Sequence, residues 1–306
     1  VGGLFGIAHY GNNFDNCSCS GDVEIYATED AVDAQEIGGI AGVWHNQDGQ
    51  TVTMTNCTFT GKLKTNIPDV DFYYGGLVGK PYSATGTGKL IIDGYEMVAT
   101  GVGMKDGEYY IQSVTGLKWL AEQVNGGNNF SKKVVKLAAD LDLNNEEWTP
   151  IGNSTYSFQG TFDGQNKKIS NLVITGNKSD VGLFGRTNDG EIKNLVVENA
   201  KVSGYLDVAV VAGTPYTSKY TNITVQGHVE INGFAYVGAV GGKNAYANWT
   251  NITVNVDETS YVNANSIEDG TAYRTYVGGV CGFNGEGRHS FKNIKSNINV
   301  TGSTID

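Results

Sequence analysis

Apolar and polar residues alternate along most of the chain, in short runs that turns separate. Residues 23–26 and 52–54 are two such runs, and residues 46–49 and 84–88 are turns rich in Gly, Asn, Asp and Thr. Alternation with a period of two is typical of β-strands that bury one face. The pattern predicts many short strands, and residues 134–176 continue it.

A short glycine motif recurs among these strands. Most copies are followed, about ten residues later, by an apolar–any–Asn–apolar pattern such as residues 192–195. The copies lie at 1–6, 37–42, 74–79, 181–185, 208–213, 237–242 and 277–282. Recurrence at a spacing of about 20–50 residues is typical of repeat proteins, whose repeats bury their apolar faces against one another. We therefore expect an all-β solenoid, with the registers of the loosest copies, 208–213 and 237–242, left open.

One stretch has the spacing of a helix. Leu117, Leu120, Ala121 and Val124 share one face of a predicted helix over 115–125. Thr115 can cap its start, and the glycines at 126 and 127 end it. A repeat protein must cover the open end of its core, so we expect this helix to act as a cap.

The repeat breaks over residues 99–112, where 105–108 reads as a turn and 109–111 as a short strand. We therefore expect a boundary near residue 99. The domains become 1–98, the end of a first repeat portion, and 99–306, a second portion that begins with the helical cap.

The Asn of the second pattern has a structural interpretation. Asn tolerates left-handed dihedrals, and stacked amides can hydrogen-bond from one repeat to the next. The residues predicted to form such a ladder are Asn16, Asn56, Asn171, Asn194, Asn222, Asn251 and Asn293. Several fit the Asn-x-Ser/Thr glycosylation pattern, which we discount because a ladder residue should be partly buried.

Composition and charge exclude some functions. The chain has 306 residues, 43 of them Gly, and a net charge of −11 with a pI near 4.8. Nucleic-acid binding needs a basic surface, which this composition does not provide. No run of about 18 apolar residues predicts a membrane-spanning helix. Because the chain begins inside a repeat and without Met, we expect it to be a monomeric segment of a longer protein.

Four cysteines are too few for a disulfide framework at this length. Cys17 and Cys57 hold the same repeat position, which elsewhere is Leu or Ile. They are either small core residues or partners in a disulfide between neighbouring repeats, since adjacent strands lie ~4.8 Å apart. Cys19 and Cys281 have no companion at metal-ligand spacing.

The motifs resemble the GLUG family of bacterial surface proteins over nearly the whole chain. Residues 3–6, 76–79 and 182–185 read Gly-Leu-any-Gly, and 116–125, 140–143, 148–152 and 162–164 are similar to the lead-in that these proteins carry. The resemblance implies a right-handed parallel β-helix on the surface of a gut-type bacterium, in proteins described as adhesins. Some members accompany a metallopeptidase domain, but this chain has no His-Glu-x-x-His motif.

Catalytic and metal-binding patterns are weak. Glycoside hydrolysis needs two carboxylates across a sugar, and Asp140/Asp142 and Asp69/Asp71 each place two on one strand face. We interpret both pairs as solvated or turn-forming residues, with cation binding or catalysis as the alternatives. The scattered histidines are predicted to be ordinary surface residues. We predict no enzyme activity, metal or cofactor.

Aromatic residues follow the glycine motifs. In a solenoid they should fall along one edge, where they could stack on sugar rings, contact a host protein or simply shield the edge. The predicted ligand-binding residues are Tyr10, Trp44, His45, Tyr82, Tyr216, Tyr246 and Phe283. The sequence thus favours a non-enzymatic cell-surface adhesin or ligand-binding module for a glycan or host protein, anchored at the outer membrane by another part of the chain. A passive stalk and a carbohydrate-active enzyme are the alternatives.

Overall fold

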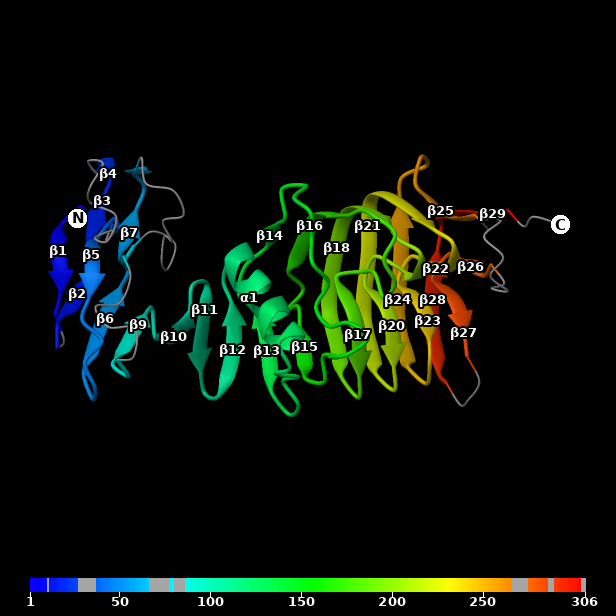
Figure 1. Cartoon of the computed structure of the whole chain (residues 1–306), viewed down its shortest axis with the longest axis horizontal. Helices are drawn as coiled ribbons and strands as arrows, with labels where there is room; N and C mark the ends of the chain where they lie inside the picture. The colour runs from blue at the N-terminus through cyan, green and yellow to red at the C-terminus, as the bar shows by residue number, and fades with distance from the viewer. Residues whose placement is uncertain are drawn as a thin grey trace. The chain divides into compact units, whose positions relative to one another are not determined.

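The chain is mostly β-structure. The computed structural model describes residues 1–9, 11–26, 37–65, 77–79, 86–265, 275–285 and 289–303, and these contain one helix, as predicted (Figure 1). Two compact units form, Val1–Gly116 and Leu117–Asp306, called unit 1 and unit 2 below. Compact units and repeat portions are different divisions, so the boundary near residue 99 stays a prediction.

Unit 1 begins with two equivalent sets of four strands. The first set is β1 (Phe5–Ala8), β2 (Asn13–Asp15), β3 (Ser18–Cys19) and β4 (Val23–Ile25), and the second is β5 (Ala41–Trp44), β6 (Thr51–Thr55), β7 (Thr58–Phe59) and β8 (Leu63–Thr65). Each strand pairs in parallel with its counterpart, so Phe5 lies opposite Ala41 and Val23 opposite Leu63. The alternation in the sequence therefore marks repeats that stack in register.

The parallel arrangement ends at β9 (Lys89–Ile92), which pairs in parallel with β6 but antiparallel with β10 (Tyr95–Ala99). The strands β11 (Val102–Lys105) and β12 (Glu108–Ile111) continue this antiparallel meander. Asp106 and Gly107 connect them with φ of 53° and 79°, the conformation of a tight hairpin. The turn predicted at 105–108 and the short strand predicted at 109–111 are present, and the meander covers most of the stretch, 99–112, where the repeat was expected to break.

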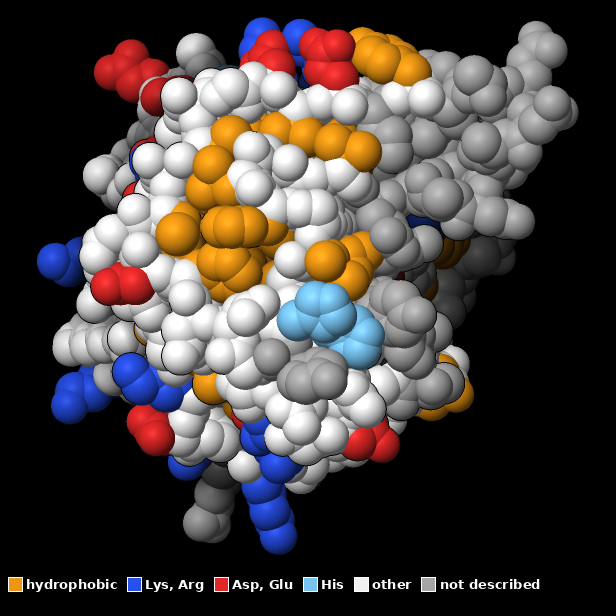
Figure 2. All heavy atoms as spheres, turned by 90° about the vertical axis from the view of Figure 1, so that its left-hand side faces the viewer, with side chains coloured by type: hydrophobic (Ala, Val, Ile, Leu, Met, Phe, Trp, Pro, Cys, Tyr) orange, Lys and Arg blue, Asp and Glu red, His pale blue; other side chains and the backbone are white. Residues whose placement is uncertain are grey.

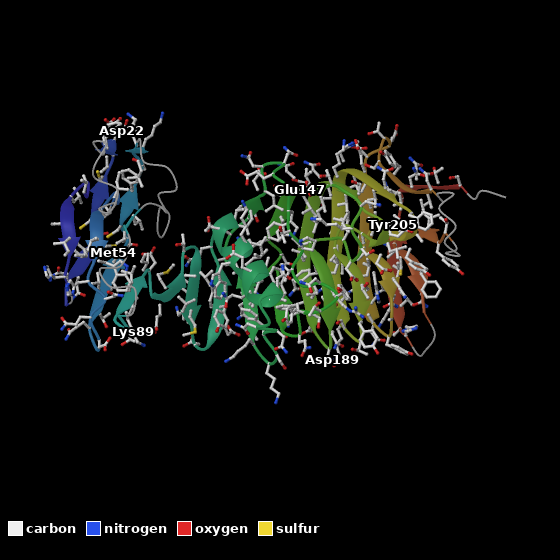
Figure 3. All side chains as sticks on the ribbon, in the orientation of Figure 1. Asp22, Met54, Lys89, Glu147, Asp189 and Tyr205 are labelled. Carbon is white, nitrogen blue, oxygen red and sulfur yellow. The ribbon has the colours of Figure 1, made fainter. Side chains whose placement is uncertain are left out.

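Unit 1 exposes apolar side chains along β1. Val1, Leu4, Phe5 and Ile7 are 39–50% exposed, and Figure 2 shows that apolar side chains gather on this face. In the described part of the chain β1 pairs only with β5. The buried core of unit 1 lies on the other side, around residues such as Met54 (Figure 3).

The helix α1 (Val114–Asn125) matches the predicted span. Its predicted apolar face, Leu117 to Val124, is buried. The predicted N-cap residue of the helix, Thr115, is wrong, because Thr115 lies within the helix. Ser113 precedes the helix and is its N-cap residue, since its Oγ accepts a hydrogen bond from the Gly116 amide at 3.2 Å. At 12 residues, this helix does not reach the length or hydrophobicity that crossing a membrane requires, and the described chain holds no other candidate.

The strands of unit 2 stack in parallel from repeat to repeat (Figure 1). One sheet contains β13 (Val134–Leu137), β15 (Thr161–Asp163), β18 (Glu191–Ser203), β21 (Lys219–Gly233), β24 (Asn248–Val256) and β28 (Phe291–Ser296) in this order. The shorter strands β14 (Leu141–Asp142), β16 (Lys168–Ile174), β25 (Tyr261–Asn265) and β29 (Asn299–Ser303) pair within the same sheet. A second sheet consists of β17 (Phe184–Asn188), β20 (Ala212–Tyr216), β23 (Gly241–Asn244) and β27 (Cys281–Asn284). A third sheet consists of β19 (Leu206–Val208), β22 (Ala235–Gly238) and β26 (Val277–Gly278).

Aromatic and branched side chains fill the interior of unit 2. Tyr220 and Trp249 are fully buried and stack at 5.2 Å, and Phe162 contacts Phe184 at 5.3 Å. The Tyr220 hydroxyl lies 2.7 Å from Thr187 Oγ1, and burial raises the pKa of Tyr220. Phe162, Tyr220 and Trp249 occupy one position of successive repeats, with Ile192 between the first two, so the core is continuous from one repeat to the next.

The glycine motif is explained by close backbone contacts. A Cβ on Gly38 would lie 2.1 Å from the Ala41 carbonyl oxygen, within the same motif copy. A Cβ on Gly242 would lie 2.4 Å from the Asp207 carbonyl carbon, in the preceding repeat. The looser copies at 208–213 and 237–242 are in register, because Val208 pairs with Val237 and Ala212 with Gly241.

Candidate functional site

Each repeat of unit 2 bends at residues with positive φ, and these residues align between repeats. In the described chain they form four rows: Asn194, Asn222, Asn251 and Asn293; Asn171, Asn199 and Gly227; Asp180, Asp207 and Tyr236; and Asp189, Thr217 and Tyr246. Asn and Gly are the residues that most readily adopt this conformation. The first two rows follow that preference, and the last two do not.

The first row is an amide ladder. Asn222 Nδ2 donates to Asn194 Oδ1 at 2.8 Å, and Asn251 Nδ2 donates to Asn222 Oδ1 at 2.9 Å. Asn293 continues the row at 2.8 Å, and Asn194 donates to Asp163 at 3.0 Å. Each amide thus bonds to the one in the preceding repeat.

The other predicted ladder residues lie elsewhere. Asn171 belongs to the second row, where it donates to Asp142 at 2.8 Å and accepts from Asn199 at 3.3 Å. Asn16 and Asn56 also have positive φ, but the Asn56 amide N–H donates to Asp93 Oδ1. One continuous ladder through all seven residues is therefore wrong, because unit 1 and unit 2 each stack their own repeats.

The ladder is more exposed than expected. Asn222, Asn251 and Asn293 are exposed, so the burial by which we discounted glycosylation is absent there. The amide nitrogen of Asn222 is nevertheless already used in a hydrogen bond to Asn194.

The predicted aromatic edge is only partly assembled. In unit 1 Trp44 is 6% exposed, so its place on a binding edge is wrong, and His45 is half-buried with its ring stacked on His9 at 5.0 Å. Tyr10 and Tyr82 lie outside the described residues. Figure 2 shows histidine side chains, in pale blue, beside the apolar side chains of this face.

In unit 2, Tyr216 contacts Tyr246 edge-on at 5.8 Å, and Tyr246 contacts His289 at 5.7 Å. These three residues are called the tyrosine edge here. Tyr246 belongs to the row that begins at Asp189, which Figure 3 labels, and Tyr216 directly precedes Thr217 of that row. Phe283 is not among them. Its aromatic contacts are with the two residues described next.

Phe283 closes an aromatic triangle with Tyr236 and Tyr276. The ring centroids lie 5.2 Å apart for Tyr236–Phe283, 5.1 Å for Tyr276–Phe283 and 5.6 Å for Tyr236–Tyr276, whose planes differ by 10°. All three side chains are half-buried. Lys243 Nζ lies 5.3 Å from the centre of the Tyr236 ring, a cation–π contact.

The positions of Tyr236 and Phe283 are filled by charged residues in some of the other repeats. Asp180, Asp207, Tyr236 and Tyr276 are equivalent residues, as are Arg186, Thr214, Lys243 and Phe283. We call these eight residues the charged–aromatic strip. Thr214 Oγ1 donates to Asp180 Oδ1, and Asp180 also lines a pocket of ≈190 Å³ with Asn153 and Lys178.

Asp207 is the most perturbed acid of the strip. Burial and the neighbouring Asp180 carboxylate raise the pKa of Asp207 to about 7, although Lys243 and Arg186 act in the opposite direction. Its Oδ1 is buried and has no hydrogen-bond partner within the described chain. A carboxyl group with a pKa near neutral pH can donate a hydrogen bond to a bound ligand when it is protonated and accept one when it is ionised.

The other candidate acids have structural roles. Asp140 Oδ1 accepts from the Lys168 amide at 2.9 Å, and Asp142 Oδ1 accepts from the Asn144 amide at 2.8 Å. Asp69 and Asp71 lie outside the described residues. Groups of three or more potential metal ligands do not occur in the part of the chain that the structure describes.

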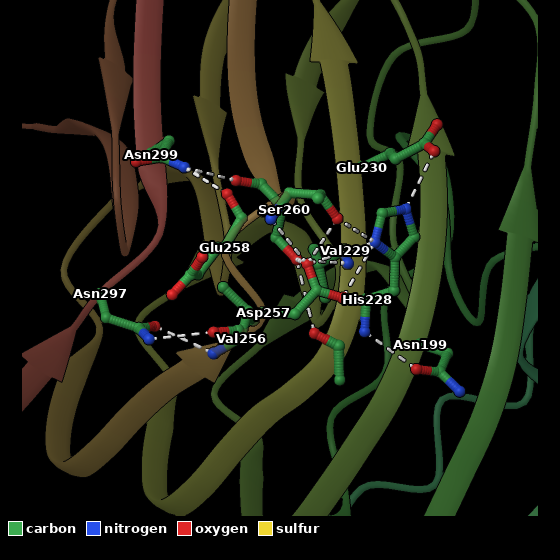
Figure 4. Close-up of polar contacts among 12 residues, drawn as sticks. Asn199, His228, Val229, Glu230, Val256, Asp257, Glu258, Ser260, Asn297 and Asn299 are labelled. Carbon is green, nitrogen blue, oxygen red and sulfur yellow. Dashed lines mark hydrogen bonds and ion pairs between the residues drawn. The ribbon is translucent and has the colours of Figure 1, made fainter.

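His228 forms a surface cluster that the sequence did not reveal (Figure 4). Its Nε2 lies 3.0 Å from Glu230 Oε1 and its Nδ1 lies 3.1 Å from Asp257 Oδ2, and these contacts, that with Glu230 first, raise the pKa of His228. Hydrogen bonds led by the Thr259 hydroxyl lower the pKa of Asp257 to about 2. Glu230 also pairs with Lys201, so the cluster ties together neighbouring repeats.

Sequence reasoning missed most of the strip, although a signal was available. Asp180, Asp207, Tyr236 and Tyr276 each stand directly before a copy of the glycine motif. That position changes from acid to aromatic along the chain, whereas the motif beside it stays nearly constant. Variation at a fixed repeat position was the signal.

Comparisons with known proteins place the chain near two relatives. It is 34% identical to halomucin of Haloquadratum walsbyi over 149 residues, which is 44% of this chain and 2% of that protein. It is 30% identical to a Gly-rich membrane protein of Evansella cellulosilytica over 121 residues, 38% of this chain and 13% of that protein. The chain thus spans a small part of both relatives. No family model and no solved structure matches it.

Proposed function

We propose that the chain is a non-enzymatic binding module of a cell-surface protein, and that the charged–aromatic strip of unit 2 binds a glycan. In this proposal the parallel repeats are a right-handed β-helix with α1 as a cap, as the resemblance to the GLUG family implies. The observation that carries the proposal is the triangle of Tyr236, Tyr276 and Phe283 beside Asp207 and Lys243.

The strip has the chemistry that sugar recognition needs. Aromatic rings offer flat apolar faces against which the C–H face of a sugar can pack, and tyrosine adds a hydroxyl. Asp180, Asp207, Arg186 and Lys243 supply both acceptors and donors for sugar hydroxyls. Because the acids and cations are balanced, the strip favours a neutral sugar over a strongly charged one.

Tyr236 provides a further argument. It has a φ of 59°, which costs a bulky residue about 1–2 kcal/mol relative to ordinary backbone. Asp fills this position in the two preceding repeats, so strain of this kind at Tyr236 favours a functional role for its side chain. Tyr246 has a φ of 66°, so the same argument applies to the tyrosine edge.

The cell-surface setting is supported by the relatives. One of them is a membrane protein by name, and the other is a halomucin. Both are far longer than the matched region, which fits a module of a large exported protein. A host surface protein is the second partner that such a module could bind.

The test is a glycan array probed with the native chain and two matched variants. Tyr236→Asn removes the ring from the strip and keeps a residue that tolerates positive φ, while Tyr246→Asn makes the same change on the tyrosine edge. We expect native binding that Tyr236→Asn lowers at least tenfold and Tyr246→Asn leaves within twofold. The reverse result would assign binding to the tyrosine edge, and no binding by the native chain would favour a passive stalk.

One observation favours an enzyme as the second candidate. Asp180 and Asp207 occupy equivalent positions in adjacent repeats, and the pKa of Asp207 is about 7, the range that suits general acid–base catalysis. Incubating array-positive glycans with the native chain and with Asp207→Asn separates the two functions. Shorter products that appear only with the native chain would replace the binding module with a carbohydrate-active enzyme.

A further inference from the structure

We propose that Cys17 and Cys57 of unit 1 form a disulfide that links neighbouring repeats when the protein meets a low-molecular-weight disulfide. Both cysteines are free thiols in this structure. The inference does not depend on the proposed glycan binding, because it concerns different residues in a different unit.

Backbone register places the two residues opposite each other. Cys17 and Cys57 directly precede β3 and β7, in which Ser18 lies opposite Thr58. The Thr58 amide donates to the Cys17 carbonyl at 2.9 Å. Neighbouring strands lie ~4.8 Å apart, within the ~4.4–6.8 Å between Cα atoms that a disulfide spans.

The sulfur atoms point toward the same place. Cys57 Sγ lies 3.6 Å from the Phe14 carbonyl oxygen, although the two residues are 43 positions apart in sequence. Cys17 Sγ lies 3.6 Å from the carbonyl oxygen of Asp15, the next residue. The Cys57 thiol also interacts with the backbone and the thiol of Cys17, so the two sulfurs lie close together.

The two thiols differ in the way that exchange requires. Cys17 is half-buried and can be reached by a small disulfide, whereas Cys57 is buried and burial raises the pKa of its thiol. The Cys17 thiolate attacks the small disulfide, forms a mixed disulfide and releases one small thiol. Cys57 then loses its proton and attacks Cys17 Sγ, so that the Cys17–Cys57 bond forms and a second small thiol leaves. The protein loses two electrons and two protons, and the small disulfide gains them.

The other cysteines provide internal controls. Cys19 is half-buried like Cys17 and only two residues away, but it lies opposite Phe59. Cys281 in unit 2 lies opposite Gly241. Neither has a thiol at the matching position of the next repeat, so we expect neither to form an internal bridge.

The test treats the whole chain with glutathione disulfide, blocks the remaining thiols with iodoacetamide and maps the peptides by mass spectrometry. The protein is cleaved after Glu, because no Lys or Arg precedes Lys62 and trypsin would leave all three cysteines of unit 1 in one peptide. Cleavage after Glu puts Cys57 in the peptide 37–96 but leaves Cys17 and Cys19 together in the peptide 1–24, so the Cys19→Ser variant is used beside the native chain. We expect a peptide pair linking Cys17 to Cys57 in both proteins, and none in Cys17→Ser.

Unfolding of the native chain in urea gives a second readout that needs no variant. The oxidised protein should unfold at a higher urea concentration than the reduced one, because the bridge closes a loop of about 40 residues in the unfolded chain. A stable mixed disulfide on Cys17, a bridge that uses Cys19, or oxidation that lowers the unfolding midpoint would each overturn the proposal.

Discussion

The amide ladder and the charged–aromatic strip are built on the same backbone and carry different side chains. In all four repeats of the ladder and in the first three of the strip, one residue bends the chain with φ of 52–59°. Along the ladder the residue is Asn each time, because its amide bonds to the equivalent amide in the repeat before it. Along the strip the residue changes from Asp180 and Asp207 to Tyr236. Where a side chain hydrogen-bonds to the equivalent side chain of the next repeat, keeping the same residue stabilises the stack. Where the residue varies, each repeat presents a different side chain to a ligand.

The sharpest way to break the ladder is Asn222→Val. The change removes two amide hydrogen bonds, each of which contributes about 0.5–1.5 kcal/mol to stability. It also places a β-branched residue at a φ of 56°, which strains the backbone. We expect the free energy of unfolding of unit 2 to fall by about 3 kcal/mol, measured by urea denaturation.

The matched control is Asn222→Gly, which keeps a residue suited to the bend and loses only the amide. It should lower the free energy of unfolding by about 1 kcal/mol, because water replaces the lost bonds at this exposed site. Equal effects of Val and Gly would mean that the bend imposes no strain and that the comparison between the two rows fails.

The strip responds to pH in a way that the ladder cannot. The pKa of Asp207 is about 7 in the folded chain against 3.8 for the free group. Between these values the folded state binds more protons, so its stability is fully present below pH 3.8 and falls as the pH rises toward 7. Partial exposure screens this effect, and we expect Asp207→Asn to be more stable than the native chain by about 2 kcal/mol above pH 7.

The measurement is urea unfolding of both proteins at a series of pH values from 4 to 8. The difference in the free energy of unfolding should grow from pH 4 to about pH 7 and level off toward pH 8. A constant difference would show that Asp207 does not titrate there. Asp142, whose pKa is lowered by hydrogen bonds from the Asn144 amide and the Asn171 side chain, is the matched site that should show no such rise.

The sequence was informative where chemistry repeats. The strand periodicity, the helix and the ladder asparagines of unit 2 all follow from residues that recur at fixed positions. Trp44 and Phe283 do not share the edge predicted for the aromatic residues, because they stand at different offsets from their glycine motifs. Phe283 follows the last glycine by one residue and Trp44 by two. Successive strand residues point to opposite faces, so a shared neighbourhood in sequence did not mean a shared surface.

The antiparallel meander and the pairing of Tyr236, Tyr276 and Phe283 could not be read in this way. β9 has the same alternation as the earlier strands, and its partner β10 is set by the short turn at Asp93 and Gly94, both with positive φ. The triangle joins two rows that are separate in sequence, and only the stacking of repeats brings them together.

The smallest effect distinguishes strain from packing in the strip. Tyr236→Ala removes the ring and leaves a residue that still prefers negative φ, whereas Tyr236→Asn removes the ring and relieves the strain of 59°. Both lose the contacts with Tyr276 and Phe283. We therefore expect the Asn variant to exceed the Ala variant by about 1 kcal/mol in the free energy of unfolding, with the native chain close to the Asn variant. If Asn and Ala prove equally stable, the tyrosine is held without strain, and its place in the strip is explained by packing rather than by a binding role.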